Sequence, residues 1–214
     1  MLICMRHSVR LDSDGTKIWD DKDDRPYDTP ISDFDLPVQQ AALVRHHNIS
    51  IVVVSPFRRC LQTAGIICRE LGIESITVDF GLSESVDAIR RCMRSGNEVL
   101  TFLSKSNMQI ALGEGVVIAD VQGTPSDINI NESLSRSSDR YFDTFLKWHD
   151  ISKRSLAATE SVLFVSHGHG VETFAGRCMS SSREIYCIEE CGFLVVDRDS
   201  KVLVESSRAG FITD

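Results

Sequence analysis

The chain has no apolar run of the roughly 18 residues that a membrane-spanning helix needs, so no membrane partner is expected. It also lacks an excess of positive charge. Its 23 Lys and Arg against 31 Asp and Glu give a net charge of −8, which argues against a nucleic-acid partner. Internal repeats, low-complexity tracts and Gly-, Pro- or Ser-rich linkers are absent from the sequence. A single domain over residues 1–214 is therefore the simplest organisation.

The cysteines do not form a disulfide pattern. There are seven, an odd number, spread from Cys4 to Cys191, and this fits reduced buried thiols better than a disulfide framework. The first ten residues meet two arginines and a histidine too soon for the apolar region of a secretory signal. We therefore expect a cytoplasmic protein.

The sequence contains alternating strand and helix patterns. Short apolar runs, rich in β-branched residues, predict strands at 1–5, 49–54, 76–78, 161–165, 193–196 and 202–204. Helical spacing of apolar residues predicts helices at about 33–47, 57–71, 86–94 and 133–153, and another beyond residue 170.

This alternation predicts an α/β fold. Strand, helix and strand in succession imply right-handed crossovers in a largely parallel sheet. We expect a three-layer α/β/α domain with a mostly parallel central sheet of about six strands. The less regular stretches at about 11–30 and 85–131 are interpreted as insertions, and the second as a small cap.

Basic side chains follow three of the predicted strands. Arg6, His7 and Arg10 come after the first strand, Arg59 comes one turn after the second, and His167 follows the strand at 161–165. In open α/β sheets, ligands bind at the carboxyl ends of the strands. Guanidinium groups match phosphate oxygens, so the pattern predicts an anion site that contains a nucleophilic imidazole.

Three of these segments carry a family resemblance. Arg6-His7-Ser8, the segment Ser55–Ala64 (SPFRRCLQTA) and Ser166-His167-Gly168 resemble the histidine phosphatase superfamily, also called phosphoglycerate-mutase-like. Their order and separations also fit that superfamily. The resemblance implies a phosphoglycerate-mutase-like fold.

Further segments resemble one branch of the superfamily. These are Arg6–Asp12, Asp28–Ser32, Gln40-Ala41 and Gly81–Glu84. They are most similar to the branch that holds the suppressor-of-T-cell-receptor-signalling phosphatase domains and insect ecdysteroid-phosphate phosphatase.

The resemblance implies a role for each matching residue. It makes His7 the nucleophile, which carries a covalent phosphohistidine, and Glu84 the general acid and base. It implies a phosphate site formed by Arg6, Arg10, Arg59 and His167. Arginines supply the charge compensation that a metal would otherwise provide, so metal-independent phosphomonoester hydrolysis without a cofactor is expected. The substrate would be a phosphorylated small molecule or a phosphoprotein, and a homodimer is left open.

Two departures from the family pattern keep alternatives open. Ser8 stands where the family usually has Gly, and Val9 stands where the branch usually has Glu. A side chain at position 8 would either crowd the phosphate pocket or hydrogen-bond to the phosphate. The alternatives are a catalytically weakened phosphate-binding or scaffold domain and phosphoryl transfer of the phosphoglycerate-mutase type.

Two other residue spacings suggest rival sites. Cys4 and Arg10 have the Cys-x5-Arg spacing of cysteine-dependent phosphatases, but the intervening residues include no glycine, and Cys4 falls inside an apolar strand. His167-x-His169 has the spacing of two zinc ligands, but no carboxylate-rich motif accompanies it. Neither rival accounts for Arg59.

Overall fold

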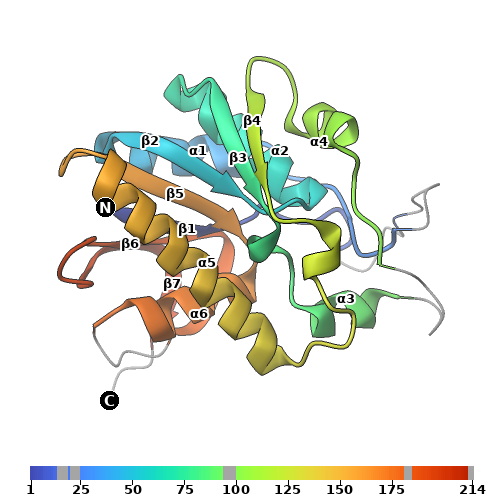
Figure 1. Cartoon of the computed structure of the whole chain (residues 1–214). Helices are drawn as coiled ribbons and strands as arrows, with labels where there is room; N and C mark the ends of the chain where they lie inside the picture. The colour runs from blue at the N-terminus through green and yellow to red at the C-terminus, as the bar shows by residue number, and fades with distance from the viewer. Residues whose placement is uncertain (14–18, 20–24, 94–99, 181–184, 212–214) are drawn as a thin grey trace.

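A single mixed sheet forms the centre of the molecule. The computed structural model describes residues 1–13, 19, 25–93, 100–180 and 185–211, and in these residues seven strands run in the order β4-β3-β2-β5-β1-β6-β7 (Figure 1). The strands are β1 (Leu2–Arg6), β2 (Ile49–Val54), β3 (Ser75–Asp79), β4 (Val117–Gln122), β5 (Ser161–Ser166), β6 (Ile185–Val196) and β7 (Leu203–Phe211). Strands β1 to β5 are mutually parallel, whereas β6 and β7 are antiparallel to their neighbours.

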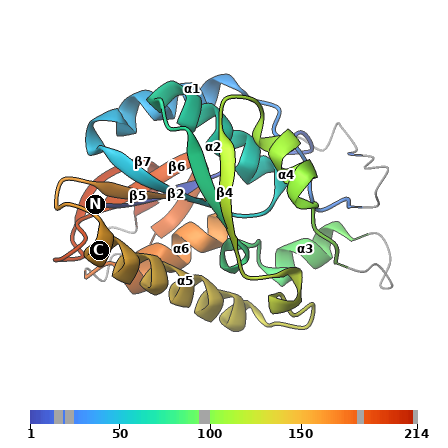
Figure 2. The same ribbon diagram turned by 45° about the horizontal axis from the view of Figure 1, so that its top comes forward.

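Helices cover both faces of this sheet. They are α1 (Asp35–Val44), α2 (Arg58–Leu71), α3 (Val86–Cys92), α4 (Lys105–Leu112), α5 (Leu134–Ser155) and α6 (Gly168–Cys178). Helices α1, α2 and α4 lie on one face, and α5 and α6 lie on the other (Figure 2). Of the helices in the described residues, none is long and apolar enough to cross a membrane.

The alternation of side chains along β1 explains why the protein has two cores. Ile3 and Met5 pack into the core under α1 and α2, whereas Leu2 and Cys4 pack into the core under α5 and α6. Successive strand residues point to opposite faces, so a strand covered on both sides must be apolar throughout. This is why the inner strands appear in the sequence as unbroken apolar runs.

The parallel strands deliver several polar residues to one edge of the sheet. His7 follows β1, Ser55 follows β2 and His167 follows β5. The chain after β3 turns through the 3₁₀ segment Phe80–Leu82 and then reaches Glu84. Because the strands are parallel, their carboxyl ends meet on the same side, and the candidate site lies there.

The three-layer α/β/α prediction is confirmed, and the structure corrects its details. The sheet has seven strands where about six were expected. The range 85–131, interpreted as a cap insertion, contains α4, which packs on α2, and β4, which pairs with β3. This part of the chain therefore extends the sheet and one helical layer. The last two strands are longer than predicted. Half of the insertion expected over 11–30, residues 14–18 and 20–24, lies outside the described residues.

Candidate active site

His7 is held rigidly just past the end of β1. Its backbone NH donates to the carbonyl of Ser166 at 2.9 Å, and its carbonyl accepts from the NH of Cys191 at 3.0 Å. The ring is buried, and Nδ1 lies 2.7 Å from the carbonyl of Ser8. A carbonyl can only accept, so Nδ1 carries the proton and Nε2 keeps a free lone pair.

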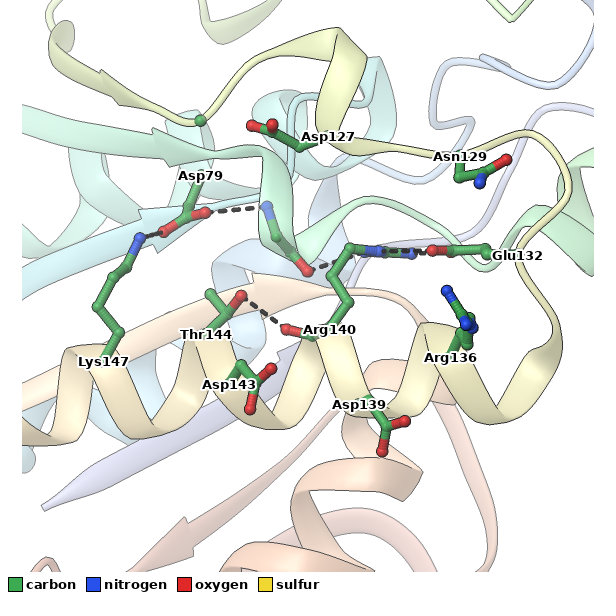
Figure 3. A pocket seen from close by; sticks show the side chains of 12 residues that line it. Asp79, Asp127, Asn129, Glu132, Arg136, Asp139, Arg140, Asp143, Thr144 and Lys147 are labelled. Atoms are coloured by element: carbon green, nitrogen blue, oxygen red, sulfur yellow. Dashed lines mark hydrogen bonds and ion pairs between the residues drawn. The ribbon is translucent and has the colours of Figure 1, made fainter.

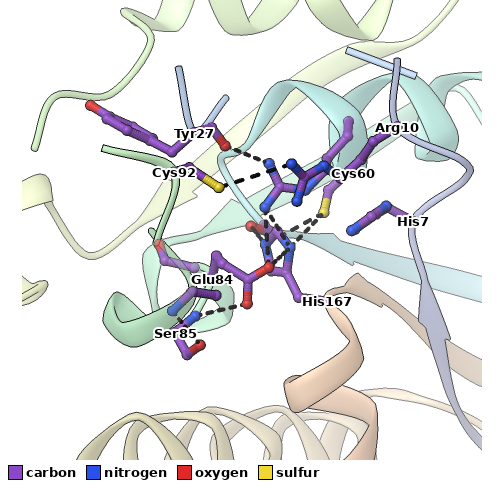
Figure 4. A network of polar contacts seen from close by, with 12 residues as sticks. His7, Arg10, Tyr27, Cys60, Glu84, Ser85, Cys92 and His167 are labelled. Atoms are coloured by element: carbon purple, nitrogen blue, oxygen red, sulfur yellow. Dashed lines mark hydrogen bonds and ion pairs between the residues drawn. The ribbon is translucent and has the colours of Figure 1, made fainter. Parts of the chain in front are cut away.

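His167, Glu84 and Arg59 form a buried network beside His7 (Figure 4). Nδ1 of His167 lies 3.2 Å from Oε2 of Glu84, and Nη2 of Arg59 lies 3.2 Å from both of these atoms. The centres of the His7 and His167 rings are 5.4 Å apart. The opposite nitrogen of His167, Nε2, lies 2.9 Å from the hydroxyl of Ser55. Residues far apart in sequence therefore meet in one small volume.

Arg59 is a buried cation with one donor left over. Its side chain is only 1% exposed, its Nη1 donates to the carbonyl of Tyr27, and its guanidinium lies over the ring of Phe57. Its Nε is buried and has no hydrogen-bond partner among the residues that the structure describes. A buried donor without a partner costs roughly 1–3 kcal/mol, a cost that an anion at this position would remove.

Two groups on the neighbouring strand β6 bind the guanidinium of Arg6. Its Nη1 donates to the carbonyl of Ile188 at 2.6 Å, and its Nη2 pairs with Oε1 of Glu190 at 2.9 Å. The Nε of Arg6, like that of Arg59, is buried without a partner. The side chain passes Gly168, the residue after His167, with Nε 3.6 Å from where a Cβ of Gly168 would lie.

Arg10 stands apart from this cluster. Its guanidinium forms a two-point contact with the carboxylate of Asp12, at 2.8 and 2.5 Å. Its Nη2 also lies 3.9 Å from the thiol of Cys92, at the end of α3. The acidic partner of Arg10 is thus only two residues away in the sequence, whereas Arg6 and Arg59 pair with distant glutamates.

Burial keeps both histidines neutral. It lowers the pKa of His7 well below its ordinary value, and the nearby charges of Arg59 and Arg6 add to the effect. Burial also lowers the pKa of His167 to about 4, even though Glu84 opposes the shift. A neutral imidazole is the nucleophilic form of histidine, so His7 retains it well into the acidic range.

Glu84 is ionised in the site as it stands. Burial alone would favour the protonated acid, but His167 and Arg59 outweigh burial and bring the pKa of Glu84 well below its usual value. Its second oxygen, Oε1, accepts from the backbone NH of Ser85 at 2.9 Å. Glu84 is therefore a carboxylate whose charge depends on the same arginine that an incoming anion would attract.

A second set of contacts holds the turn that carries Glu84. Arg140, on α5, pairs with Glu132 (Figure 3). It also donates to the carbonyls of Gly81 and Ser83. A Cβ on Gly81 would lie 1.9 Å from the hydroxyl of Thr144, so only glycine fits so close to α5. These residues line a pocket of about 640 Å³ behind the turn. No sequence pattern indicated Arg140 or Glu132.

The side chains of Ser8 and Cys4, the two residues behind the alternative hypotheses, have their contacts outside the cluster. The hydroxyl of Ser8 donates to the carbonyl of Asp33 at 2.8 Å. Cys4 lies within β1 and packs into the core under α5 and α6. Burial, with Cys178 nearby, raises the pKa of Cys4 well above its usual range, which leaves an inert thiol.

Two groups of side chains in the described residues have the spacing of metal ligands. The donor atoms of His7, Glu84 and His167 lie within 4.8 Å of one another, and so do those of a surface group, His46, His47 and Glu205. Arg59 stands inside the first group, where its charge opposes a cation. His169, the second histidine of the His-x-His spacing, contacts Ser138 and Glu172.

One family model matches the chain. Residues 38–87 match the histidine phosphatase superfamily (branch 1), and this segment includes Arg59 and Glu84. His7 and His167 lie outside it. A comparison with curated protein sequences gives no match.

Several solved structures share the fold over nearly the whole chain. Ecdysone phosphate phosphatase from Bombix mori, in complex with tungstate, is 15% identical, with a TM-score of 0.66 and coverage of 95% of this chain and 91% of that one. A mycobacterial glucosyl-3-phosphoglycerate phosphatase is 14% identical, with a TM-score of 0.56 and coverage of 98% and 95%. The phosphoserine phosphatase of Entamoeba histolytica is 16% identical, with a TM-score of 0.54 and coverage of 96% and 95%.

The family match supports phosphatase or phosphoryl-transfer activity. At these identities the neighbours themselves establish the fold alone. Together with the matched segment, they confirm the likeness of this chain to the histidine phosphatase superfamily.

Proposed function

We propose that the protein is a metal-independent phosphomonoesterase that works through a covalent phosphohistidine at His7. The observation that carries the proposal is a neutral imidazole with its Nε2 lone pair free, in a buried site whose two arginines each have an Nε without a partner. A phosphoryl group would satisfy both orphan donors. Guanidinium groups then compensate the charge that spreads over its oxygens in the transition state.

The first half-reaction forms the phosphoenzyme. The lone pair of His7 Nε2 attacks phosphorus, the ester P–O bond breaks, and the leaving oxygen takes a proton from Glu84. Phosphate binding prepares this step, because it adds negative charge beside Glu84 and draws Arg59 toward the phosphate. Both changes raise the pKa of Glu84 from its lowered value in the free site, so that Glu84 gains a proton as the ester binds.

The second half-reaction releases phosphate. Glu84, now a carboxylate, takes a proton from water, whose oxygen attacks phosphorus. The P–N bond breaks and its electron pair returns to Nε2 of His7. The hydrogen bond from Nδ1 of His7 to the carbonyl of Ser8 holds the ring in the same tautomer throughout. His167, Arg6 and Arg10 complete the binding of the phosphoryl group.

The substrate we propose is a phosphorylated small molecule or phosphoprotein. The neighbours are named for phosphate esters of a steroid, a glycosylated glycerate and serine, and this range supports a site that recognises the phosphoryl group more than the remainder of the ester. A mutase would retain the phosphoryl group and return it to a second oxygen. Incubation with 3-phosphoglycerate separates these two activities, because a mutase forms an isomer and a phosphatase releases inorganic phosphate.

The central test is to trap the phosphoenzyme. Rapid quench after mixing with an aryl phosphate should yield an adduct on His7 that is labile in acid and stable in alkali. His7→Ala should form none, whereas His169→Ala, which alters a histidine outside the cluster, should form it normally. Turnover without a histidine adduct, or with an adduct on another residue, would refute the mechanism.

A further inference from the structure

Strand β6 contains a large bulge beside the candidate active site. Its Ile188 pairs with Ala209 and its Phe193 pairs with Ser207, so the segment 189–192 faces the single residue Arg208 on β7. We call this segment the β6 bulge. Bulges of this kind re-aim side chains and occur often next to active sites.

The backbone of the β6 bulge shows that its shape is demanding. Cys191 has a φ of 55°, in the left-handed region that residues with a side chain rarely adopt. A Cβ on Gly192 would lie 2.6 Å from Ile188 and 2.8 Å from the carbonyls of Glu189 and Arg208. A conformation this costly persists only where the surrounding structure holds it in place.

The β6 bulge contacts the two functional residues at the end of β1. The NH of Cys191 donates to the carbonyl of His7 at 3.0 Å. The carbonyl of Ile188 and the carboxylate of Glu190 take one terminal nitrogen each of the Arg6 guanidinium. These two contacts occupy Nη1 and Nη2. They leave Nε, which is buried and has no partner in the described part of the chain, beside Gly168, the residue after His167.

Glu189 and Glu190 are neighbours with different surroundings. Glu190 pairs with Arg6, whereas Glu189 pairs with Arg208 at 2.7 Å and its side chain is 57% exposed. The two carboxylates are the same chemical group at adjacent positions of the same strand. Glu189 therefore offers a matched control for Glu190.

We propose that Glu190 is a positioning residue that holds the Arg6 guanidinium with its Nε–H directed at the bound phosphoryl group. This inference rests on the function proposed above. Without Glu190, Arg6 would keep its charge but lose its fixed orientation, so the phosphate would have to order the side chain on binding. Ordering a long side chain at the moment of binding weakens affinity.

The sign of the effect separates this role from simple electrostatics. If Glu190 acted only as a negative charge near the site, its removal would strengthen the binding of a phosphate anion. If it positions Arg6, its removal weakens binding even though a repulsive charge has been lost. The two roles therefore predict changes in opposite directions.

The experiment compares Glu190→Gln, Glu190→Ala and Glu189→Gln with the unmodified protein. We expect Glu190→Ala to raise both KM for an aryl phosphate and Ki for inorganic phosphate about tenfold, the size of one lost charge-assisted contact, while kcat stays within about twofold. Glu190→Gln keeps an oxygen that can accept from Arg6, so it should lie between Glu190→Ala and the unmodified protein. Glu189→Gln should leave KM and Ki unchanged or slightly lowered.

Each outcome decides one question. Equal values of Ki in Glu190→Ala and the unmodified protein, tighter phosphate binding in either Glu190 variant, or a fall in kcat at constant KM would overturn the positioning role. If Glu190→Ala fails to fold, the measurement on Glu190→Gln decides the question in its place. Failure of the unmodified protein to form a phosphohistidine or to bind phosphate would instead refute the proposed function.

Discussion

Two histidine–carboxylate pairs with nearly equal geometry lie in different parts of this molecule. His167 and Glu84 are 3.2 Å apart past the carboxyl ends of the parallel strands, and His47 and Glu205 are 3.0 Å apart just before the amino end of β2. The first pair lies in the interior with Arg59 in contact, whereas His46 joins the second pair with 64% of its side chain exposed. Distance alone therefore does not mark a site.

What separates the two pairs is their surroundings. In the buried pair, desolvation and a guanidinium act on both groups, and the pKa of each moves well away from its ordinary value. In the outer pair His47 is buried, but the side chain of Glu205 is 32% exposed, so water screens its carboxylate, and partly exposed pairs of this kind contribute little to stability. Burial combined with an unsatisfied cation thus turns an ordinary ion pair into a candidate for catalysis.

The largest expected difference between the two pairs appears when the carboxylate of each is neutralised in turn. Glu84→Gln should lower kcat/KM by about 10²–10⁴-fold, the usual contribution of a general acid and base. Glu205→Gln should leave kcat/KM within about twofold. The loss in Glu84→Gln should be greater for an alkyl phosphate than for an aryl phosphate, because an alkoxide needs its proton more than a phenolate does. Equal losses in both variants would end the comparison.

An intermediate effect is expected on the pH dependence of stability. His167 binds a proton near pH 6.5 in the unfolded chain but only near 4 in the folded protein. The folded state therefore loses stability as the pH falls from 6.5 to 4, by at most about 3 kcal/mol from this residue. Urea unfolding across this range should show a flatter dependence for His167→Asn than for the unmodified protein.

The matched variant for this measurement is His47→Asn. The pKa of His47 is also lowered, by burial first, but Glu205 opposes the shift and the neighbouring His46 is open to water. Its replacement should flatten the pH dependence less than His167→Asn does. A larger change in His47→Asn would show that the outer pair is the more strongly desolvated one.

The smallest expected effect concerns the space beside His7. If the buried pair is catalytic, a substrate must fit beside His7. The hydroxyl of Ser8 donates to the carbonyl of Asp33, so we expect it to leave this space free. Ser8→Gly should therefore change kcat/KM for an aryl phosphate by less than about twofold. A large gain in rate would show that Ser8 crowds the pocket and would favour the catalytically weakened alternative.

The sequence predicts the inner strands and their helices closely, because a strand that is buried on both faces must be apolar throughout. Strand β2 was expected at 49–54 and is found there, and α2 ends at Gly72, whose φ of 70° suits glycine. Strand β4, at the edge of the sheet, is half exposed and contains Asp120 and Gln122. Its apolar run, residues 117–119, is short and is followed directly by Asp120, so the strand is hard to recognise in the sequence.

The candidate site divides in a similar way. His7, Arg59 and His167 follow strands whose ends the sequence predicts, so their convergence could be expected from parallel topology. Arg140 and Glu190 could not be expected, because their roles depend on which backbone carbonyls and side chains the folded chain brings to them. In sequence they look like any other charged residue on a helix or a strand.

The position of β1 has a consequence for how the protein assembles during synthesis. This first strand pairs on one side with β5 and on the other with β6, so both of its neighbours come from the last third of the chain. A nascent chain that ends before residue 161 contains His7 but neither of the strands that flank β1. Such non-local pairing makes folding slow, and a ribosome-bound fragment of this length should depend on chaperones until the final strands emerge.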